Sequence, residues 1–132
     1  MYMLDTNICM YIIKKRTESV LRQLKTKKEN GLFIYTITLS ELESGIENSA
    51  HKEKNRIALM EFLSILGIKQ FDEYAAKKYG IIKRNLNLSQ NCLIEPMDML
   101  IIAHAKSQNM ILVTSNTKEF TGINDLKVEN WI

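Results

Sequence analysis

The sequence predicts an α/β domain in which helices cover both faces of a mainly parallel central sheet of four to five strands. Short apolar runs alternate along the 132 residues with longer stretches in which apolar residues recur at helical spacing. No repeat, low-complexity tract or Pro/Gly-rich linker interrupts the chain, and Pro96 is its only proline. Alternating strands and helices favour a three-layer arrangement. The length suits a single domain spanning residues 1–132.

Uninterrupted apolar runs are typical of strands whose two faces are both buried. We predict strands at residues 2–4, 32–35, 68–71 and 110–113, with a short edge strand at 127–129. Each run is followed by polar residues that can start a turn or a helix. The strand ends are therefore where functional side chains are expected.

The intervening segments show helical periodicity. We predict helices at residues 7–14, 18–28, 41–48, 52–66, 72–86 and 98–108. In the fourth of these, apolar residues at three-residue steps are expected to form the buried face; they are Ile57, Met60, Leu63 and Leu66. The last helix is apolar nearly all round, which indicates burial.

Composition excludes several classes of protein. The net charge of +3 permits a polyanionic partner without requiring one. Two cysteines, Cys9 and Cys92, are too few for a metal-ligand set and are expected to be reduced thiols. The first residues lack the basic and apolar regions of a secretory signal, and no apolar run approaches the roughly 20 residues that span a bilayer. We therefore expect a cytoplasmic protein with no membrane partner.

Three acidic residues follow predicted strands or begin predicted helices, and ligands of parallel sheets bind at the carboxyl ends of the strands. Asp5 follows the first strand, Glu41 lies in the first turn of a helix capped by Thr38 or Ser40, and Asp98 opens the buried helix. Each of these three residues can also be interpreted as purely structural. Asp5 and Asp98 can be helix N-caps, and Glu41 can serve the helix dipole. An aspartate among apolar neighbours nevertheless needs a partner or a cation.

The fourth predicted strand ends in small polar residues, after which Asn116 and Glu119 can add oxygen ligands or a polar clamp. Glu119 is otherwise an ordinary surface acid. His104 is expected to satisfy a local hydrogen bond, and Glu43 and Glu47 to form a solvated face. Oxygen donors without a histidine or cysteine set select Mg²⁺ or Mn²⁺, and carboxylate-bound cations suit phosphodiester hydrolysis.

Five segments, in order along the whole chain, resemble the motifs of PIN-domain ribonucleases, most closely the VapC-type toxins of bacterial toxin–antitoxin pairs. They are residues 3–7 (MLDTN), 38–45 (TLSELESG), 94–105 (IEPMDMLIIAHA), 112–120 (LVTSNTKEF) and 126–131 (LKVENW). The resemblance implies a PIN-like α/β/α sandwich. It also implies that Asp5, Glu41 and Asp98 bind Mg²⁺ or Mn²⁺, while Asn116 and Glu119 complete the catalytic site.

The same resemblance implies the toxin of a type II toxin–antitoxin system, a metal-dependent endoribonuclease. Some relatives cut the anticodon loop of initiator tRNA and others cut ribosomal RNA, so the structured RNA it cleaves stays open. The implied partners are a second copy in a homodimer and a cognate VapB-like antitoxin, through which the complex binds promoter DNA. Glu95 and Ser115 depart from the residues that many relatives carry. We expect Glu95 to face solvent and both departures to affect specificity more than activity.

Basic clusters are candidates for contact with RNA phosphates, although solvated helix faces explain them equally well. They are Lys14 to Arg16, Lys25 with Lys27 and Lys28, and Lys77 and Lys78 with Lys83 and Arg84. Two other functions compete. A phosphorelay receiver would use Asp72 as its phosphate acceptor, but Asp5 lacks the adjacent acid of such domains. A PIN module that only binds RNA or a protein would have lost core carboxylates, and none is lost.

Overall fold

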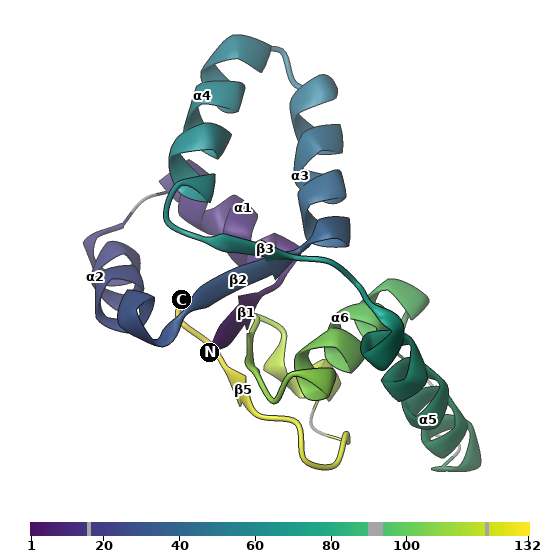
Figure 1. The fold of residues 1–132 in the computed structure, drawn as a ribbon. Helices are drawn as coiled ribbons and strands as arrows, with labels where there is room; N and C mark the ends of the chain where they lie inside the picture. Colours follow the sequence, from purple (N-terminus) through teal and green to yellow (C-terminus); the bar gives the residue numbers. More distant parts are fainter. Residues whose placement is uncertain (16, 90–93, 121) are drawn as a thin grey trace.

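The computed structural model describes residues 1–15, 17–89, 94–120 and 122–132, and Arg16 and Cys92 lie outside these ranges. Within them, five strands form one sheet in the order β3-β2-β1-β4-β5, with every neighbouring pair parallel (Figure 1). The strands are β1 (Tyr2–Leu4), β2 (Leu32–Tyr35), β3 (Gly67–Lys69), β4 (Ile111–Val113) and β5 (Val128–Glu129). The predicted α/β class with a parallel sheet is confirmed.

Helices cover both faces of this sheet. They are α1 (Thr6–Lys15), α2 (Glu18–Lys27), α3 (Thr36–Glu47), α4 (Lys52–Leu63), α5 (Glu73–Ser89) and α6 (Pro96–Ser107), with 3₁₀ turns η1 (Lys28–Asn30) and η2 (Thr117–Phe120). Helices α3 and α4 stand side by side and project away from the sheet (Figure 1). No helix in the described ranges combines the length and apolar character needed to cross a bilayer.

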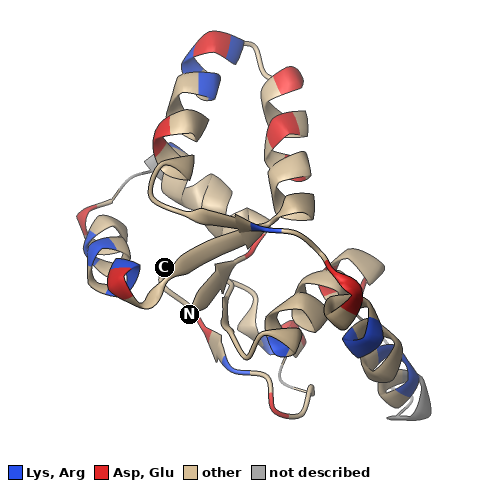
Figure 2. Cartoon of the chain, viewed as in Figure 1, with Lys and Arg blue, Asp and Glu red and all other residues tan. Residues whose placement is uncertain are grey.

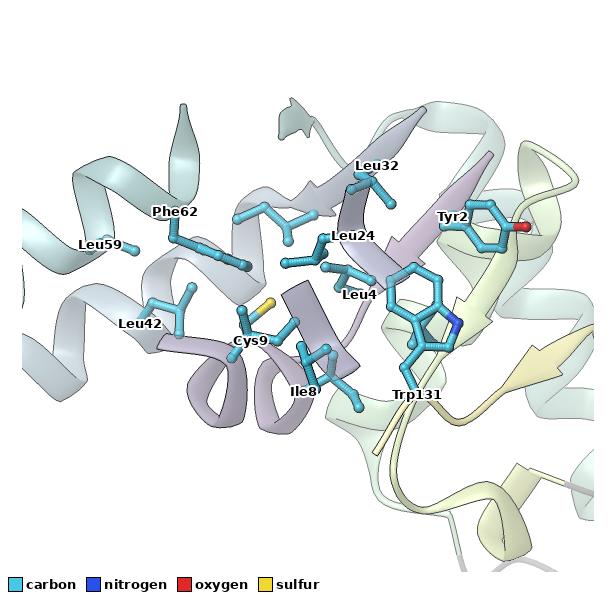
Figure 3. Packing of buried hydrophobic residues seen from close by; sticks show 14 of the residues in the cluster. Tyr2, Leu4, Ile8, Cys9, Leu24, Leu32, Leu42, Leu59, Phe62 and Trp131 are labelled. Atoms are coloured by element: carbon cyan, nitrogen blue, oxygen red, sulfur yellow. The ribbon is translucent and has the colours of Figure 1, made fainter. Parts of the chain in front are cut away.

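Strand alternation divides the apolar residues between two cores. On β1, Leu4 packs with α1 to α4, whereas Met3 faces the opposite core under α5 and α6. On β2, Ile34 and Tyr35 divide in the same way. Figure 3 shows the first core, in which Trp131 packs edge-on against Tyr2 with ring centroids 5.3 Å apart. The sheet is therefore buried on both faces.

Three helices begin earlier than the sequence analysis predicted, α1 by a single residue and α3 and α6 by more. Helix α3 follows β2 without a turn, starting at Thr36 from an extended Tyr35. Ser40 thus lies inside the helix, where its hydroxyl donates to the carbonyl of Thr36 at 3.0 Å. Glu41 is consequently in the second turn, and the predicted first-turn position is wrong. Helix α6 starts at Pro96, whose fixed φ suits the first helical position, so Asp98 is its third residue.

The buried face predicted for residues 52–66 is wrong for its first two members, while Leu63 and Leu66 pack against the first core as expected. Ile57 and Met60 are 59% and 65% exposed, and the residues this helix buries are Leu59 and Phe62. Both sets recur at three-residue steps, so periodicity alone could not choose between them. The helix ends at Leu63, which leaves a short turn before β3.

Strand β3 ends two residues earlier than predicted, because the chain must leave the sheet before Asp72 can cap α5. The backbone N–H of Ala75 donates to Asp72 Oδ1 at 3.0 Å, which fixes the start of α5. Phe71 leaves the sheet and packs against the second core. The residue proposed as a phosphate acceptor in the receiver reading is therefore a helix N-cap.

Glycine at position 67 lets β3 approach the ring of Phe33 on β2. A Cβ atom at this position would lie 2.6 Å from two carbon atoms of that ring. The Lys69 ammonium lies 4.5 Å from the centroid of the same ring, which limits the space into which the ring can move.

We expect Gly67→Ala to lower the free energy of unfolding by about 1–3 kcal/mol, the usual effect of overpacking. The matched control is Gly45→Ala in α3, where an added Cβ meets no heavy atom within 4 Å. That control should raise stability by about 0.5–1 kcal/mol, because alanine suits a helix better than glycine. Urea unfolding curves measure both, and a Gly67→Ala protein as stable as wild type would contradict this account.

Candidate active site

A cavity of about 190 Å³ opens at the carboxyl end of β1. The chain connects β1 to β2 on one side, while β4 pairs with β1 on the other, so the cavity lies where the sheet's connectivity changes direction. The residues that line it are Asp5, Thr6, Asn7, Tyr35, Glu41, Glu95, Met97, Asp98 and Ile101. Three segments distant in sequence thus contribute carboxylates to one cavity.

Asp5 is both a helix cap and a cavity residue. Its backbone N–H donates to the carbonyl of Val113 at 3.0 Å, and its Oδ1 accepts the N–H of Ile8 at 2.8 Å. The Thr114 hydroxyl also donates to its carboxylate. Burial raises the pKa of Asp5 in spite of these bonds, and the charge of Glu41 raises it further. The N-cap reading is correct for Asp5, and it leaves the carboxylate part of the cavity wall.

Glu41 is fixed by the first residue of α1. The Thr6 hydroxyl donates to Glu41 Oε1 at 2.7 Å, joining the start of α1 to the second turn of α3. Glu41 is exposed to solvent while it lines the cavity. This hydrogen bond holds the carboxylate beside the cavity, where its charge acts on Asp5 and Asp98.

Asp98 lies in the first turn of α6 and is half-buried. Glu95, not Asp98, occupies the N-cap position, so the N-cap reading of Asp98 is wrong. Burial raises the pKa of Asp98, and the charges of Glu119, Glu95, Asp5 and Glu41 raise it further, in that order. Asp98 therefore experiences the field of every carboxylate around the cavity.

The two remaining predicted site residues lie at the margin. Asn116 and Glu119 are exposed, and neither lines the cavity. Glu119 is close enough for its charge to act on Asp98, whereas the contact of Asn116 is a backbone N–H that donates to Thr114 Oγ1 at 3.1 Å. Glu95 is exposed, as expected, but it also borders the cavity.

The donor set fits a hard divalent cation. Among the described residues, no three histidine, cysteine, aspartate or glutamate side chains form a ready-made metal cluster. Mg²⁺, however, keeps several of its waters and needs only one or two carboxylates. The charged groups of the cavity are carboxylates alone. Burial raises the pKa values of Asp5 and Asp98, and repulsion between the carboxylates adds to the shift; a cation would relieve that repulsion.

Sequence reasoning missed Tyr35. Its side chain is 2% exposed, yet it lines the cavity. Burial raises its pKa well above the usual range, and the charges of Glu41, Asp98 and Asp5 add to this shift. The sequence did contain a signal for this role. Tyr35 is the last residue of a predicted strand, and strand alternation places its side chain on the face opposite to that of Ile34.

The hydrogen bond expected for His104 is not found. The side chain is fully buried, and neither ring nitrogen has a partner among the described residues. The ring instead packs edge-on against Tyr35 and Phe71, with centroids 5.6 Å away in each case. Burial lowers its pKa, so the neutral ring serves as packing.

The acidic face of α3 is paired rather than simply solvated. Arg56 on α4 binds Glu43 through two hydrogen bonds of 2.8 and 3.2 Å, and it lies 3.7 Å from Glu47. The arginine lowers the pKa of Glu43. Figure 2 shows these acidic turns of α3 beside the mixed charges of α4. This pairing links α3 to α4 on the exposed side of the hairpin.

The basic residues predicted on α5 are exposed. They are Lys77, Lys78, Lys83 and Arg84 (Figure 2). None of them forms a salt bridge with a carboxylate in the described part of the chain. Each of the two clusters has one ammonium over an aromatic ring, with Lys83 lying 5.8 Å from the ring centroid of Tyr79 and Lys27 5.2 Å from that of Tyr2.

The raised pKa of Asp98 has a consequence for stability. The folded chain holds the Asp98 proton more tightly than the unfolded chain, in which the pKa is near its ordinary value of 3.8. The contribution of Asp98 to stability is therefore fully present below that value, is lost as pH rises through the raised folded pKa, and stays absent at neutral pH. In EDTA, Asp98→Asn should melt at or above the wild-type Tm at pH 7 and lose less stability between about pH 4 and 7.

A matched control removes a carboxylate from the first turn of another helix. Glu53 in α4 is exposed and does not line the cavity. Glu53→Gln should lower stability slightly, by about 0.3–1 kcal/mol, because only the interaction with the helix dipole is lost. Thermal melts across this pH range measure both variants. A lower Tm for Asp98→Asn at pH 7 would show that Asp98 is not under electrostatic strain.

Comparison with known proteins agrees with this architecture. Residues 2–125 match the family model described as PIN domain. The chain is 41% identical to Ribonuclease VapC2 of Rickettsia felis, over 98% of this chain and 97% of that protein. It is 36% identical to the tRNA(fMet)-specific endonuclease VapC of Shigella flexneri, over 98% and 97% of the two chains.

A solved structure gives the same result. VapBC2 from Rickettsia felis, bound to a DNA fragment from its promoter, contains a chain that superposes with a TM-score of 0.93 at 39% identity. The match covers 99% of this chain and 98% of that one. The chain therefore belongs to the PIN-domain family and, within it, to the VapC-type ribonuclease toxins of type II toxin–antitoxin systems.

Proposed function

We propose that the chain is a Mg²⁺- or Mn²⁺-dependent endoribonuclease that hydrolyses phosphodiester bonds at the cavity beside β1. The observation that carries this proposal is the presence of Asp5, Glu41 and Asp98, from three distant segments, in one cavity wall. Burial and neighbouring carboxylates raise the pKa values of Asp5 and Asp98, and such shifts in a cavity are typical of functional sites.

A different part of the fold positions each of the three carboxylates. Asp5 and Asp98 would bind the cation from the ends of β1 and the start of α6, and Glu41 would complete the set while Thr6 holds it. A bound cation supplies Lewis-acid stabilisation of the negative charge that develops on the phosphate oxygens. Asn116 and Glu119, at the margin, would hold the substrate or the waters around the cation. A water molecule then displaces one of the two ester oxygens.

The proposed substrate is a structured RNA, and tRNA is the first to test, since the relative from Shigella flexneri carries the name of a tRNA(fMet)-specific endonuclease. The exposed cations of α5 would contact its phosphates, because this helix packs against α6, which carries Asp98. We place this activity in the cytoplasm, where such RNA is found.

Asp5→Asn and Asp98→Asn should each lower RNA cleavage by more than about 100-fold, because a cation ligand supplies several kcal/mol and each 1.36 kcal/mol is tenfold. Asp5→Asn keeps the cap on α1, since asparagine caps a helix as well as aspartate does. Cleavage of a tRNA mixture with Mg²⁺, with Mn²⁺ and with EDTA measures the effect.

The matched control is Asp72→Asn, which changes the cap of α5 outside the cavity. This variant should cleave RNA like wild type, and its activity would also oppose the receiver reading. Full cleavage by either cavity variant, or undiminished cleavage in EDTA, would remove the metal-dependent site from consideration.

We also propose that a cognate VapB-like antitoxin inhibits the chain by placing an apolar segment in a second cavity. This groove of about 330 Å³ lies between α1, α3 and α4, and apolar side chains dominate its wall; they are Met10, Ile13, Leu42, Ile46 and Leu59. Similar structures include toxin–antitoxin complexes, among them a DNA-bound VapBC from Salmonella typhimurium. We propose the same assembly here, a toxin homodimer within a complex that binds promoter DNA through the antitoxin.

Gly45 gives a test of the groove, because it lines the groove and is exposed on α3. Gly45→Arg should leave RNA cleavage intact while weakening antitoxin binding at least about tenfold, or 1.4 kcal/mol. Gly45→Ala is the size-matched control and should bind normally. Titration calorimetry and growth on co-expression with the neighbouring antitoxin gene measure the difference. Normal binding by Gly45→Arg would place the antitoxin elsewhere, and toxicity of wild type despite co-expression would contradict the partner itself.

A further inference from the structure

Tyr35 occupies an unusual place, between the second core and the carboxylate cavity. It ends β2, and strand alternation directs its side chain toward α6, the helix that carries Asp98. Only 2% of its surface is exposed, yet it lines the cavity together with Asp98 and Ile101. Its hydroxyl lies within the electrostatic reach of Asp5, Glu41 and Asp98.

The hydrogen bonds of the cavity leave this hydroxyl unused. Asp5 accepts bonds from Ile8 and Thr114, and Glu41 accepts one from Thr6. The Tyr35 hydroxyl is absent from the hydrogen bonds made between described residues, and it is not among their sealed, unpartnered polar atoms. A neutral donor held by packing is therefore available beside the carboxylates, whereas the Thr6 hydroxyl already donates to Glu41 and Asn7 is exposed.

Packing holds the ring in place. The His104 ring meets it edge-on at 5.6 Å, and the rest of the ring lies among buried residues of the second core. A donor already fixed by packing loses little side-chain entropy when it forms a new hydrogen bond. The oxygens of a phosphodiester are acceptors, and the surrounding carboxylates can only repel them. The three carboxylates cannot donate to these oxygens, and the fixed Tyr35 hydroxyl can.

We propose that the Tyr35 hydroxyl donates a hydrogen bond to a non-bridging oxygen of the scissile phosphate. This inference rests on the proposed ribonuclease function and adds a substrate-contacting group to it. The tyrosine itself holds no cation in this scheme. Its removal should therefore affect phosphate binding and turnover while cation binding is unchanged.

The test is Tyr35→Phe, which removes one oxygen and keeps the ring that packs against His104. Its kcat/KM for RNA should fall by about 10- to 100-fold, the effect of losing a hydrogen bond to a charged group. The rise in Tm with Mn²⁺ concentration should match that of wild type. The further rise given by dimethyl phosphate in the presence of Mn²⁺ should be smaller than in wild type.

The matched control is Tyr2→Phe, a buried strand tyrosine that faces the opposite core. It should retain wild-type cleavage and both Tm responses. Equal cleavage by Tyr35→Phe and Tyr2→Phe would overturn the inference while leaving the ribonuclease intact. Reduced cleavage accompanied by a weaker Mn²⁺ response would also overturn it, because the hydroxyl would then position a carboxylate. A wild-type protein with no metal-dependent cleavage would refute the proposed function and this inference together.

Discussion

The candidate site depends on the parallel pairing of β1 with two neighbours. Tyr2 pairs with Leu32 on β2 and with Ile111 on β4, so that all three strands run the same way. Their carboxyl ends consequently meet at one edge of the sheet, where Asp5 follows β1 and Tyr35 ends β2. A reversed neighbour would send one of these ends to the opposite edge. The hydrogen bonds between the strands thus fix how far apart the backbones of Asp5 and Tyr35 lie, whatever rotamers their side chains adopt.

Local hydrogen bonds then orient the carboxylates against their mutual repulsion. Thr6 and Glu41 are joined at 2.7 Å, and Ile8 and Thr114 hold Asp5. These donors lower the energy of the charged forms, yet burial still raises the pKa of Asp5. A charged site maintained against electrostatic strain is the expected form of a trade-off between stability and function. The surrounding apolar cores supply the stability that the cavity does not.

In the α3–α4 hairpin, different interactions determine the geometry and the stability. The Arg56–Glu43 pair is bidentate, but both side chains are 42% exposed, so solvent screens it and its contribution to stability is small. Its effect is geometric, because it holds the exposed ends of two helices together above the groove. Burial of Leu59 and Phe62 anchors the other end of the hairpin in the first core.

The sequence by itself determined the α/β class, five strands to within two residues at each end, and the acidic residues beside the cavity, because apolar periodicity and polar strand ends are local properties. Only the tertiary structure decided which face α4 buries, since Ile57 and Leu59 begin equally regular apolar series. It also decided that Glu41 lies in a second turn and that Tyr35 enters the cavity. Those outcomes depend on how strands and helices pack across the sheet. Packing between segments that are distant in the sequence produces no periodic pattern of apolar residues from which it could be predicted.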